Sequence, residues 1–533
     1  MSLQTTPTEE KTFASPLREM LSIAAPSVVT MASYTAMQFV DKLMVSRIGP
    51  EPIYVAAQGN AGIISWTLMT FSIGVSGVVS SFVSQNLGAG KPERGAAYAW
   101  NGMHLSLVWW IVIMLPGALL VPHFYEMMDH EPRVRAMETH YAQIAMAGAL
   151  FTLMSKALHN YFFGMHRPKV VAVSVIVGNL VNIVASVMLI FGPGGLPTTD
   201  GPIGTAIAHV SDPLAQLAGT LGIPAMGVAG AAIGTVIGTF FELAIPLLLF
   251  LSPSYHARYH TRTPWRPSLA CVKDLFRVGW PAGAMFINDL ICWSYLTVVL
   301  LGLGGRARAT YEGLGPEEVE RAGTIANTAG YIALQFMHLS FMPAVGISIA
   351  TQALVGKAVG AGRTEDAAHR AMLGLKLAMG YMGLCALGFY IFRESGISIF
   401  LPDTMSPEEA ARVVEVGAMV MIAAAVFQVF DAVAIVFSAA LRGAGDTVWP
   451  GLVSIVLSYA FVIGAGHLLV ELRPQWGSVG PWIGASAFII LLAFVLSYRF
   501  AQGTWKTMRL THDDDLHNLP PDENIPGPGP EVI

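Results

Sequence analysis

The sequence predicts an all-α integral membrane protein of twelve transmembrane helices, arranged as two related bundles of six. Of its 533 residues, 54% are hydrophobic and only 12% are charged, whereas soluble domains carry about 25% charged residues. Apolar runs long enough to cross a hydrocarbon layer of about 30 Å recur along almost the whole chain. Spanning β-strands would give short segments of alternating polarity instead, so helices are the expected spanning structure.

The apolar runs place each helix and divide the chain into five parts. Helices are expected at 20–47, 55–86, 98–121, 140–164, 170–192, 226–251, 275–302, 323–356, 371–393, 413–441, 448–470 and 478–500. The parts are an N-terminal segment (1–19), a first six-helix bundle (20–251), a linker (252–274), a second six-helix bundle (275–500) and a tail (501–533). The end of the tail is acidic and rich in Pro and Gly, so we expect it to be disordered. The long outer loops expected at 196–226 and 303–321 are either exit gates or tolerated insertions.

Three sequence motifs of the first half return in the second half in the same order. QNLGAGKPERGAA after the second helix is echoed by KAVGAGRTEDAAHRA after the eighth. SIAAPSVV around Pro26 is echoed by RVGWPAGA around Pro281, and NYFFGMHRPK after the fourth helix by AALRGAGDTVWP after the tenth. Six helices per half is an even number, so both halves face the same way and form a parallel repeat. Its pseudo-two-fold axis lies along the membrane normal, and substrate sites of such folds lie between the repeats.

The positions of Lys and Arg predict the orientation of the chain in the membrane. Most of the 30 basic residues fall in the loops after even-numbered helices, such as KPER and HRPK, or close to the chain ends. The positive-inside rule makes that side cytoplasmic, so both termini are expected inside a plasma (inner) membrane. The polar opening 1–17 lacks the pattern of a cleavable signal peptide, so the first helix is expected to act as the insertion signal.

Three carboxylates lie inside predicted helices: Asp41, Asp289 and Asp431. Each costs at least about 2.5–3.5 kcal/mol at the bilayer centre, so each needs a reason to be there. They are candidate sites for a coupling ion. Buried hydrogen bonding between helices, or a position near the lipid–water boundary, is the structural alternative for each of them.

Helical spacing places polar companions beside these acids. Tyr34, Gln38 and Asp41 share one helix face, and Gln428 lies one turn before Asp431. An amide oxygen near a carboxylate suits a hard cation such as Na⁺. The same amide could equally hold a protonated carboxyl group, which would favour H⁺.

Other polar residues inside the helices have two interpretations each. Asn179 and Asn182 lie one turn apart in the fifth helix, where polar helix packing explains them nearly as well as substrate binding. Glu242 in the sixth helix either packs or lines the transport pathway. Lys156 and His159 lie nearer the cytoplasmic end of the fourth helix, where a long side chain can snorkel to the interface.

The sequence lacks the residues or motifs that several other classes of protein function would require. A net charge of −5 without a basic domain gives no sign of nucleic-acid binding, and three scattered cysteines form neither a disulfide framework nor a metal cluster. The chain has no GxxxxGK[ST] phosphate loop, which excludes an ATP-driven pump within it. A membrane enzyme for lipid head groups would need clustered His and carboxylate residues, and a receptor or scaffold has no obvious use for intramembrane acids. No cofactor is expected, and the chain is expected to be a monomer.

The motifs together resemble the multidrug and toxic compound extrusion (MATE) family, over nearly everything from residue 17 to 500. The resemblance rests on FVDKLMVSRIGP, SQNLGAGKPERGA, LFRVGWPAGAMFIND, TQALVGKAVGAG and FDAVAIVFSAALRGAGDTVWP. It implies an antiporter that expels organic cations or amphipathic compounds in exchange for Na⁺ or H⁺. The rival transporter is a flippase of lipid-linked saccharide precursors. Such flippases often line the cavity with basic residues, whereas the charges here are mainly acidic.

The resemblance also assigns residues. Asp41 matches the acidic residue of the first helix that members use for coupling, and Asn182 matches the asparagine of the N-terminal cluster. Asp289 and Asp431 match the acidic pair in the C-terminal half of the NorM-like branch, and this match implies that they could form a Na⁺ site. Asp289 stands where Glu is commoner.

Three more positions depart from the family's pattern. Ser186 stands where some members have Asp or Asn, Phe427 where a Tyr is frequent, and Tyr34 where some archaeal members have Gln. These departures leave the choice between Na⁺ and H⁺ open.

Overall fold

The computed structural model describes residues 15–128, 130–197, 202–401 and 405–511, and these are almost entirely helical. The predicted disorder of the tail therefore falls on residues outside the described part. The first half holds α1 (Pro16–Ser46), α2 (Ile53–Ser76), α3 (Val79–Gly88), α4 (Pro92–Trp109), α5 (Leu115–Glu126), α6 (Pro132–Gly164), α7 (Pro168–Phe191), α8 (Pro202–Thr220) and α9 (Val228–Phe250). A short α10 (Pro253–Tyr259) lies in the linker. The second half holds α11 (Leu269–Tyr295), α12 (Leu301–Tyr311), α13 (Pro316–Gly360), α14 (Thr364–Ile391), α15 (Arg393–Ile399), α16 (Pro407–Ala444), α17 (Val448–Leu457), α18 (Gly466–Leu472) and α19 (Val479–Gln502).

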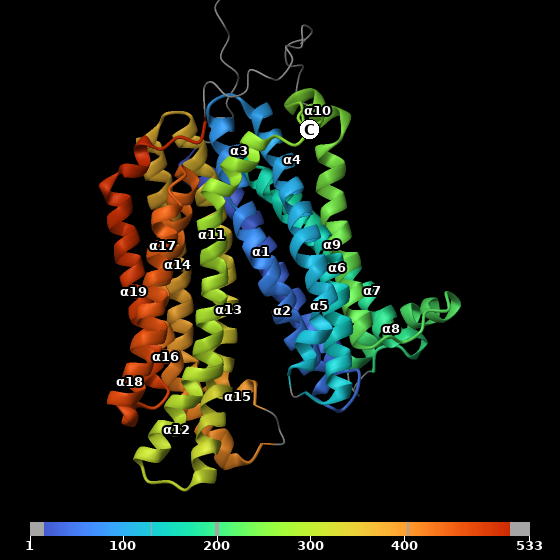
Figure 1. The fold of residues 1–533 in the computed structure, drawn as a ribbon, viewed down its shortest axis with the longest axis vertical. Coiled ribbons are helices and arrows are strands. Elements are labelled where there is room, and N and C mark those ends of the chain that lie inside the picture. Colours follow the sequence, from blue (N-terminus) through green and yellow to red (C-terminus); the bar gives the residue numbers. More distant parts are fainter. Residues whose placement is uncertain (1–14, 129, 198–201, 402–404, 512–533) are drawn as a thin grey trace, which may run out of the picture.

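The membrane-spanning helices match the sequence prediction in number. Among the described residues, 11 helices are long and apolar enough to cross a bilayer. The remaining long helix, α6, has 33 residues and carries Glu138, Lys156 and His159 along its length. It packs between α2, α4 and α9. With α6, the two halves contain six spanning helices each, and Figure 1 shows them as two groups.

Local sequence signals fix where many of these helices begin. Pro occupies one of the first two positions of α1, α4, α6, α7, α13 and α16, where its fixed φ suits the first turn and its missing N–H costs nothing. Ser15 Oγ accepts from the backbone N of Arg18, and Ser406 Oγ accepts from the N of Glu409 at 3.3 Å. Each serine satisfies an amide that the helix itself leaves unpaired.

The two expected outer loops are largely helical, which corrects the prediction. Only residues 312–315 separate α12 from α13, because both helices continue beyond their apolar segments. Arg308 Nε donates to Glu312 Oε1 one turn later at 2.8 Å, which supports a helix in a polar stretch that resembles a loop. The other loop contains α8, and Leu214 of α8 packs against an apolar cluster formed by α1, α7 and α9.

The two halves are joined at the end of the molecule that carries α10, which we call the α10 end. Gln85 Nε2 of α3 donates to Gly443 O at 3.0 Å, and Gln352 Nε2 of α13 donates to Gly77 O at 3.1 Å. Ser81 Oγ donates to Arg442 O at 2.8 Å. Toward the opposite end, which carries α8, α12 and α15, the ribbons of the halves diverge (Figure 1).

The repeated Gly-Ala-Gly motif explains this junction. A Cβ on Gly88 would overlap the carbonyl oxygen of Lys357, and one on Gly360 would overlap that of Gln85. The last glycine of each motif turns the chain with a positive φ, 75° at Gly90 and 73° at Gly362. The echo seen in the sequence therefore marks two helix ends that cross at backbone contact.

Candidate ion and substrate site

In the C-terminal half, the structure brings two of the predicted acids together. Asp289 of α11 and Asp431 of α16 lie close enough to interact electrostatically. Asp289 also interacts with Asn288, whose Nδ2 donates to Ser458 Oγ at 2.8 Å. Within the described part of the chain, neither carboxylate forms an ion pair with a Lys or Arg side chain. The pair thus places two carboxyl groups without a Lys or Arg partner between the helices of one half.

The side chain of Gln428 is held by helices that neighbour α16. It is buried, and its Nε2 donates to Ser340 Oγ of α13 and lies 3.3 Å from Met382 Sδ of α14. These contacts occupy the amide nitrogen, and a role of Gln428 beside Asp431 stays a prediction.

In the N-terminal half, Asp41 lies among neutral polar groups. It interacts with the side chain of Asn182, and Asn182 Oδ1 accepts from Ser186 Oγ at 2.8 Å. Tyr141 of α6 lies within electrostatic reach of Asp41 and bonds to Gln58. Asp41 Oδ1 is buried without a hydrogen-bond partner. This oxygen is available to a ligand or a cation, and Tyr141 is a neighbour that the sequence did not indicate.

Gln38 and Asn179 are two further candidates. Gln38 is exposed on α1, and its role in an ion or substrate site stays a prediction. Asn179 Nδ2 donates to Ser33 Oγ at 2.8 Å and to Ser33 O at 3.1 Å, which fastens α7 to α1. This contact between helices agrees with a packing role, and substrate binding by Asn179 stays a prediction.

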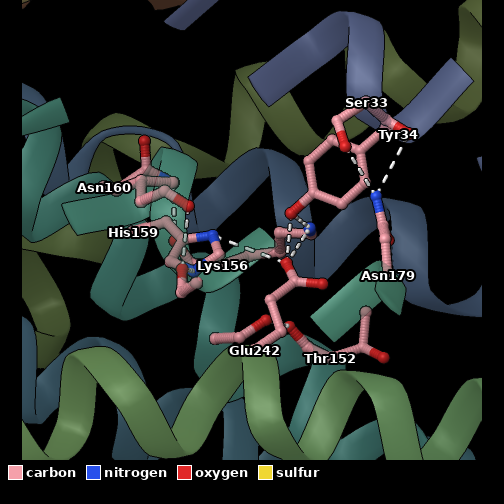
Figure 2. A network of polar contacts seen from close by, with 11 residues as sticks. Ser33, Tyr34, Thr152, Lys156, His159, Asn160, Asn179 and Glu242 are labelled. Carbon is pink, nitrogen blue, oxygen red and sulfur yellow. Dashed lines mark hydrogen bonds and ion pairs between the residues drawn. The ribbon is translucent and has the colours of Figure 1, made fainter. Parts of the chain in front are cut away.

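Tyr34 belongs to a second cluster, which sequence reasoning did not assemble (Figure 2). Its hydroxyl donates to Glu242 Oε1 of α9 and accepts from Lys156 Nζ of α6. Lys156 Nζ also lies 2.9 Å from Glu242 Oε1, and His159 Nδ1 lies 3.6 Å from the same oxygen. We call Tyr34, Lys156, His159 and Glu242 the Glu242 cluster. Lys156 thus pairs inside the protein and does not snorkel to the interface.

A sequence signal for this cluster did exist. Glu242 is the only charged residue in the apolar helix α9, and Lys156 lies inside the neighbouring α6, eight residues before its C-terminal end. An isolated acid and an isolated base inside the membrane each need a partner, and each could have been assigned to the other.

The described residues contain no group of three or more His, Cys, Asp or Glu side chains that could hold a metal ion. The two acids Asp289 and Asp431 could bind a monovalent cation or a proton together with nearby hydroxyl and amide oxygens. The clusters are therefore suited to exchanging a small cation and to attracting a positively charged molecule.

Comparison with known proteins agrees with this architecture. The MatE family model matches residues 26–188 and 319–465, one stretch in each half. The chain is 26% identical over 499 residues to a probable multidrug resistance protein NorM of Pseudomonas aeruginosa, covering 93% of this chain and 90% of the relative. A NorM protein of Pseudomonas putida is 25% identical, over 93% of this chain and 95% of the relative.

Solved structures share the fold at low sequence identity. An outward-facing multidrug resistance MATE transporter superposes with a TM-score of 0.75 and 19% identity, over 93% of this chain and 98% of that chain. The eukaryotic MATE transporter AtDTX14 gives a TM-score of 0.72 at 16% identity, over 92% and 96% of the two chains. The family match in both halves, together with the NorM relatives along nearly the full chain, shows that this multi-pass membrane protein belongs to the MatE (multidrug and toxic compound extrusion) family.

Proposed function

We propose that this chain is a secondary antiporter that exports organic cations or amphipathic compounds in exchange for Na⁺ or H⁺. The observation that carries the proposal is the facing pair Asp289 and Asp431, which no Lys or Arg neutralises within the described residues. Two neighbouring carboxylates in a medium of low dielectric repel each other, so binding a cation or a proton between them is favourable. Asp41, with its unpartnered Oδ1, supplies a corresponding position in the other half.

Coupling follows if the ion and the cargo prefer different conformations. A ligand shifts an equilibrium between two states only by its difference in affinity for them. Moving one charge through 100 mV supplies about 2.3 kcal/mol, which is enough for roughly forty-fold accumulation. Ion binding at the acids would therefore favour one access state, and binding of a cationic cargo would favour the other.

The arrangement of the halves supports an outward-facing state. If the basic loops lie in the cytoplasm, as the positive-inside rule predicts, the α10 end is the cytoplasmic end. The hydrogen bonds between the halves described above lie at that end, and the halves diverge toward the other. We place the protein in the inner (plasma) membrane as a monomer with both termini inside, and with no cofactor besides the coupling ion.

Transport in proteoliposomes tests the proposal. A fluorescent organic cation is followed under separately imposed Na⁺ and pH gradients, with wild type beside Asp41→Asn and Asp431→Asn. The matched control is Asp366→Asn, an exposed acid at the start of α14 that pairs with Arg363 three residues earlier. Gradient-driven movement that is lost in the first two variants and kept in the control is expected, and the effective gradient identifies the ion. No movement under either gradient would contradict the proposal and favour a flippase of lipid-linked saccharides.

A further inference from the structure

The Glu242 cluster is a fully formed charge site that the transport scheme does not use. The Glu242 side chain is 5% exposed and that of Lys156 is 18% exposed, so both charges lie inside the first half. Glu242 Oε1 accepts hydrogen bonds from the ammonium group of Lys156 and from the hydroxyl group of Tyr34. The Lys156 ammonium also lies over the Tyr34 ring, 3.9 Å from its centroid.

Glu242 and Asp41 lie along one helix contact. A Cβ added at Gly178 of α7 would lie 3.2 Å from Glu242 Cβ, and one at Gly238 of α9 would lie 2.7 Å from the Cβ of Asn182, the partner of Asp41. Gly178 and Asn182 are one turn apart, as are Gly238 and Glu242. Glu242 and Asn182, the residue that contacts Asp41, therefore lie on adjacent turns of the α7–α9 contact.

The two carboxylates differ in what neutralises them. Asp41 has neutral neighbours and one oxygen without a partner, whereas Glu242 has an ammonium group in contact. A charge buried in low dielectric is tolerated when an opposite charge and further hydrogen bonds accompany it. Lys156 supplies both, and it occupies the position at Glu242 Oε1 that a mobile cation would otherwise take.

We propose that Lys156 is a positioning residue, a tethered cation on Glu242, so that the first half takes up its coupling ion at Asp41 alone. This inference rests on the proposed antiport. It names Lys156 as the residue that limits the number of ions exchanged per cargo molecule. Removing the ammonium would leave Glu242 to be neutralised by a mobile ion or, through His159, by a proton. The groups that face Glu242 are Tyr34 from α1 and Lys156 and His159 from α6.

The test measures the ion-to-cargo ratio in proteoliposomes. Opposing gradients of the fluorescent organic cation and of the ion that drives wild type are adjusted until net flux is zero. The logarithm of the cargo gradient is then plotted against the logarithm of the ion gradient, and the slope gives the number of ions exchanged per cargo molecule. Lys156→Gln is expected to raise the slope by about one ion per cargo. A tenfold ion gradient would then balance a cargo gradient about tenfold steeper than in wild type.

The double variant Lys156→Gln/Glu242→Gln guards against a failure of the single variant to fold, because it removes both charges together. It is expected to keep the wild-type slope even if its rate falls. A wild-type slope in a functional Lys156→Gln variant would overturn the inference, and so would a slope lowered by one ion in the double variant, since Glu242 would then itself be a coupling site. Absence of gradient-driven flux in wild type would instead refute the antiport proposal.

Discussion

The fourth spanning helix of each half contributes a charged side chain, and the two charges have opposite sign. In the first half that helix is α6, and Lys156 lies against Glu242. In the second half it is α16, and Asp431 lies within electrostatic reach of Asp289 with no basic partner in the described residues. The repeat has thus preserved the backbone arrangement while the charges diverged. The first half pairs the carboxylate of Glu242 with an internal ammonium group, whereas the acid pair of the second half has no Lys or Arg partner among the described residues.

The largest expected effect concerns the acid pair of the second half. Asp289→Asn and Asp431→Asn should each lower ion-driven transport at least about tenfold, which corresponds to about 1.4 kcal/mol. The double variant should be little worse than either single one, because the pair acts as a unit. Initial rates in proteoliposomes measure this, with Glu394→Gln on exposed α15 as the control. Additive losses would show that the two acids work separately.

Removing one partner of the Lys156–Glu242 ion pair in the first half should lower the stability of the protein more than its transport rate. Lys156→Met leaves the buried carboxylate of Glu242 without its ion pair, a change that costs about 3 kcal/mol in buried pairs. The melting temperature in detergent should fall by several degrees, and most of the fall should be recovered in Lys156→Met/Glu242→Gln. An unchanged melting temperature in the single variant would mean that Glu242 is not charged when Lys156 is absent.

Where the halves are alike, matched substitutions should have matched effects. Gly88→Ala and Gly360→Ala each force a methyl group against a backbone carbonyl at the α10 end, which we expect to cost about 1–3 kcal/mol in the closed arrangement. Labelling of a cysteine introduced at buried Ser81, with the three native cysteines replaced, should become several-fold faster. Gly59→Ala, which meets nothing within 4 Å, is the control and should leave labelling unchanged.

The smallest effect is expected at the loops that join the fourth and fifth spanning helices. In the first half His166 Nε2 lies 3.1 Å from Ala353 O of the other half, and burial, followed by the charge of Lys357, lowers the pKa of His166 to about 4. In the second half the loop carries Asp446 instead, which pairs with Arg499 at 2.8 Å.

Because the pKa of His166 is lower in the folded protein than in the unfolded chain, its contribution to stability depends on pH. An unfolded histidine titrates near pH 6.5, so the contribution of neutral His166 is complete above about pH 6.5. It is lost as the pH falls from there toward 4, because the unfolded state binds the proton more readily. The melting temperature of wild type should therefore fall more between pH 7 and 5 than that of His166→Gln. Equal falls would contradict this assignment.

The sequence predicted the helices and the acids because both are properties of single segments. An apolar run and a lone carboxylate can be recognised without knowing the neighbours. Tyr34, Gln38 and Asp41 do share a face of α1, but spacing gives only their direction around the helix. Tyr34 meets Glu242 of α9 while Asp41 meets Asn182 of α7, two turns further along.

The outer loops were mistaken for a related reason. Hydropathy detects where a helix leaves the hydrocarbon layer, and it does not detect where the helix ends. The 45 residues of α13 extend for roughly 65 Å, well beyond any bilayer core. Its start at Pro316 is marked by capping chemistry, with Glu317 and Glu318 in the first turn.

The glycine contacts at the α10 end bear on the energetics of opening. Where Gly88 and Gly360 cross the other half, the surfaces that meet are helix-end carbonyls and peptide planes. Parting these glycine contacts exposes peptide groups, which water hydrates well. The apolar area that costs about 25 cal/mol per Å² on exposure is buried beside them, where Met20 and Ile23 of α1 pack with Leu354 of α13. The glycine crossings can therefore be tight when shut and still inexpensive to separate, and the cost of opening this end falls on the neighbouring apolar contacts.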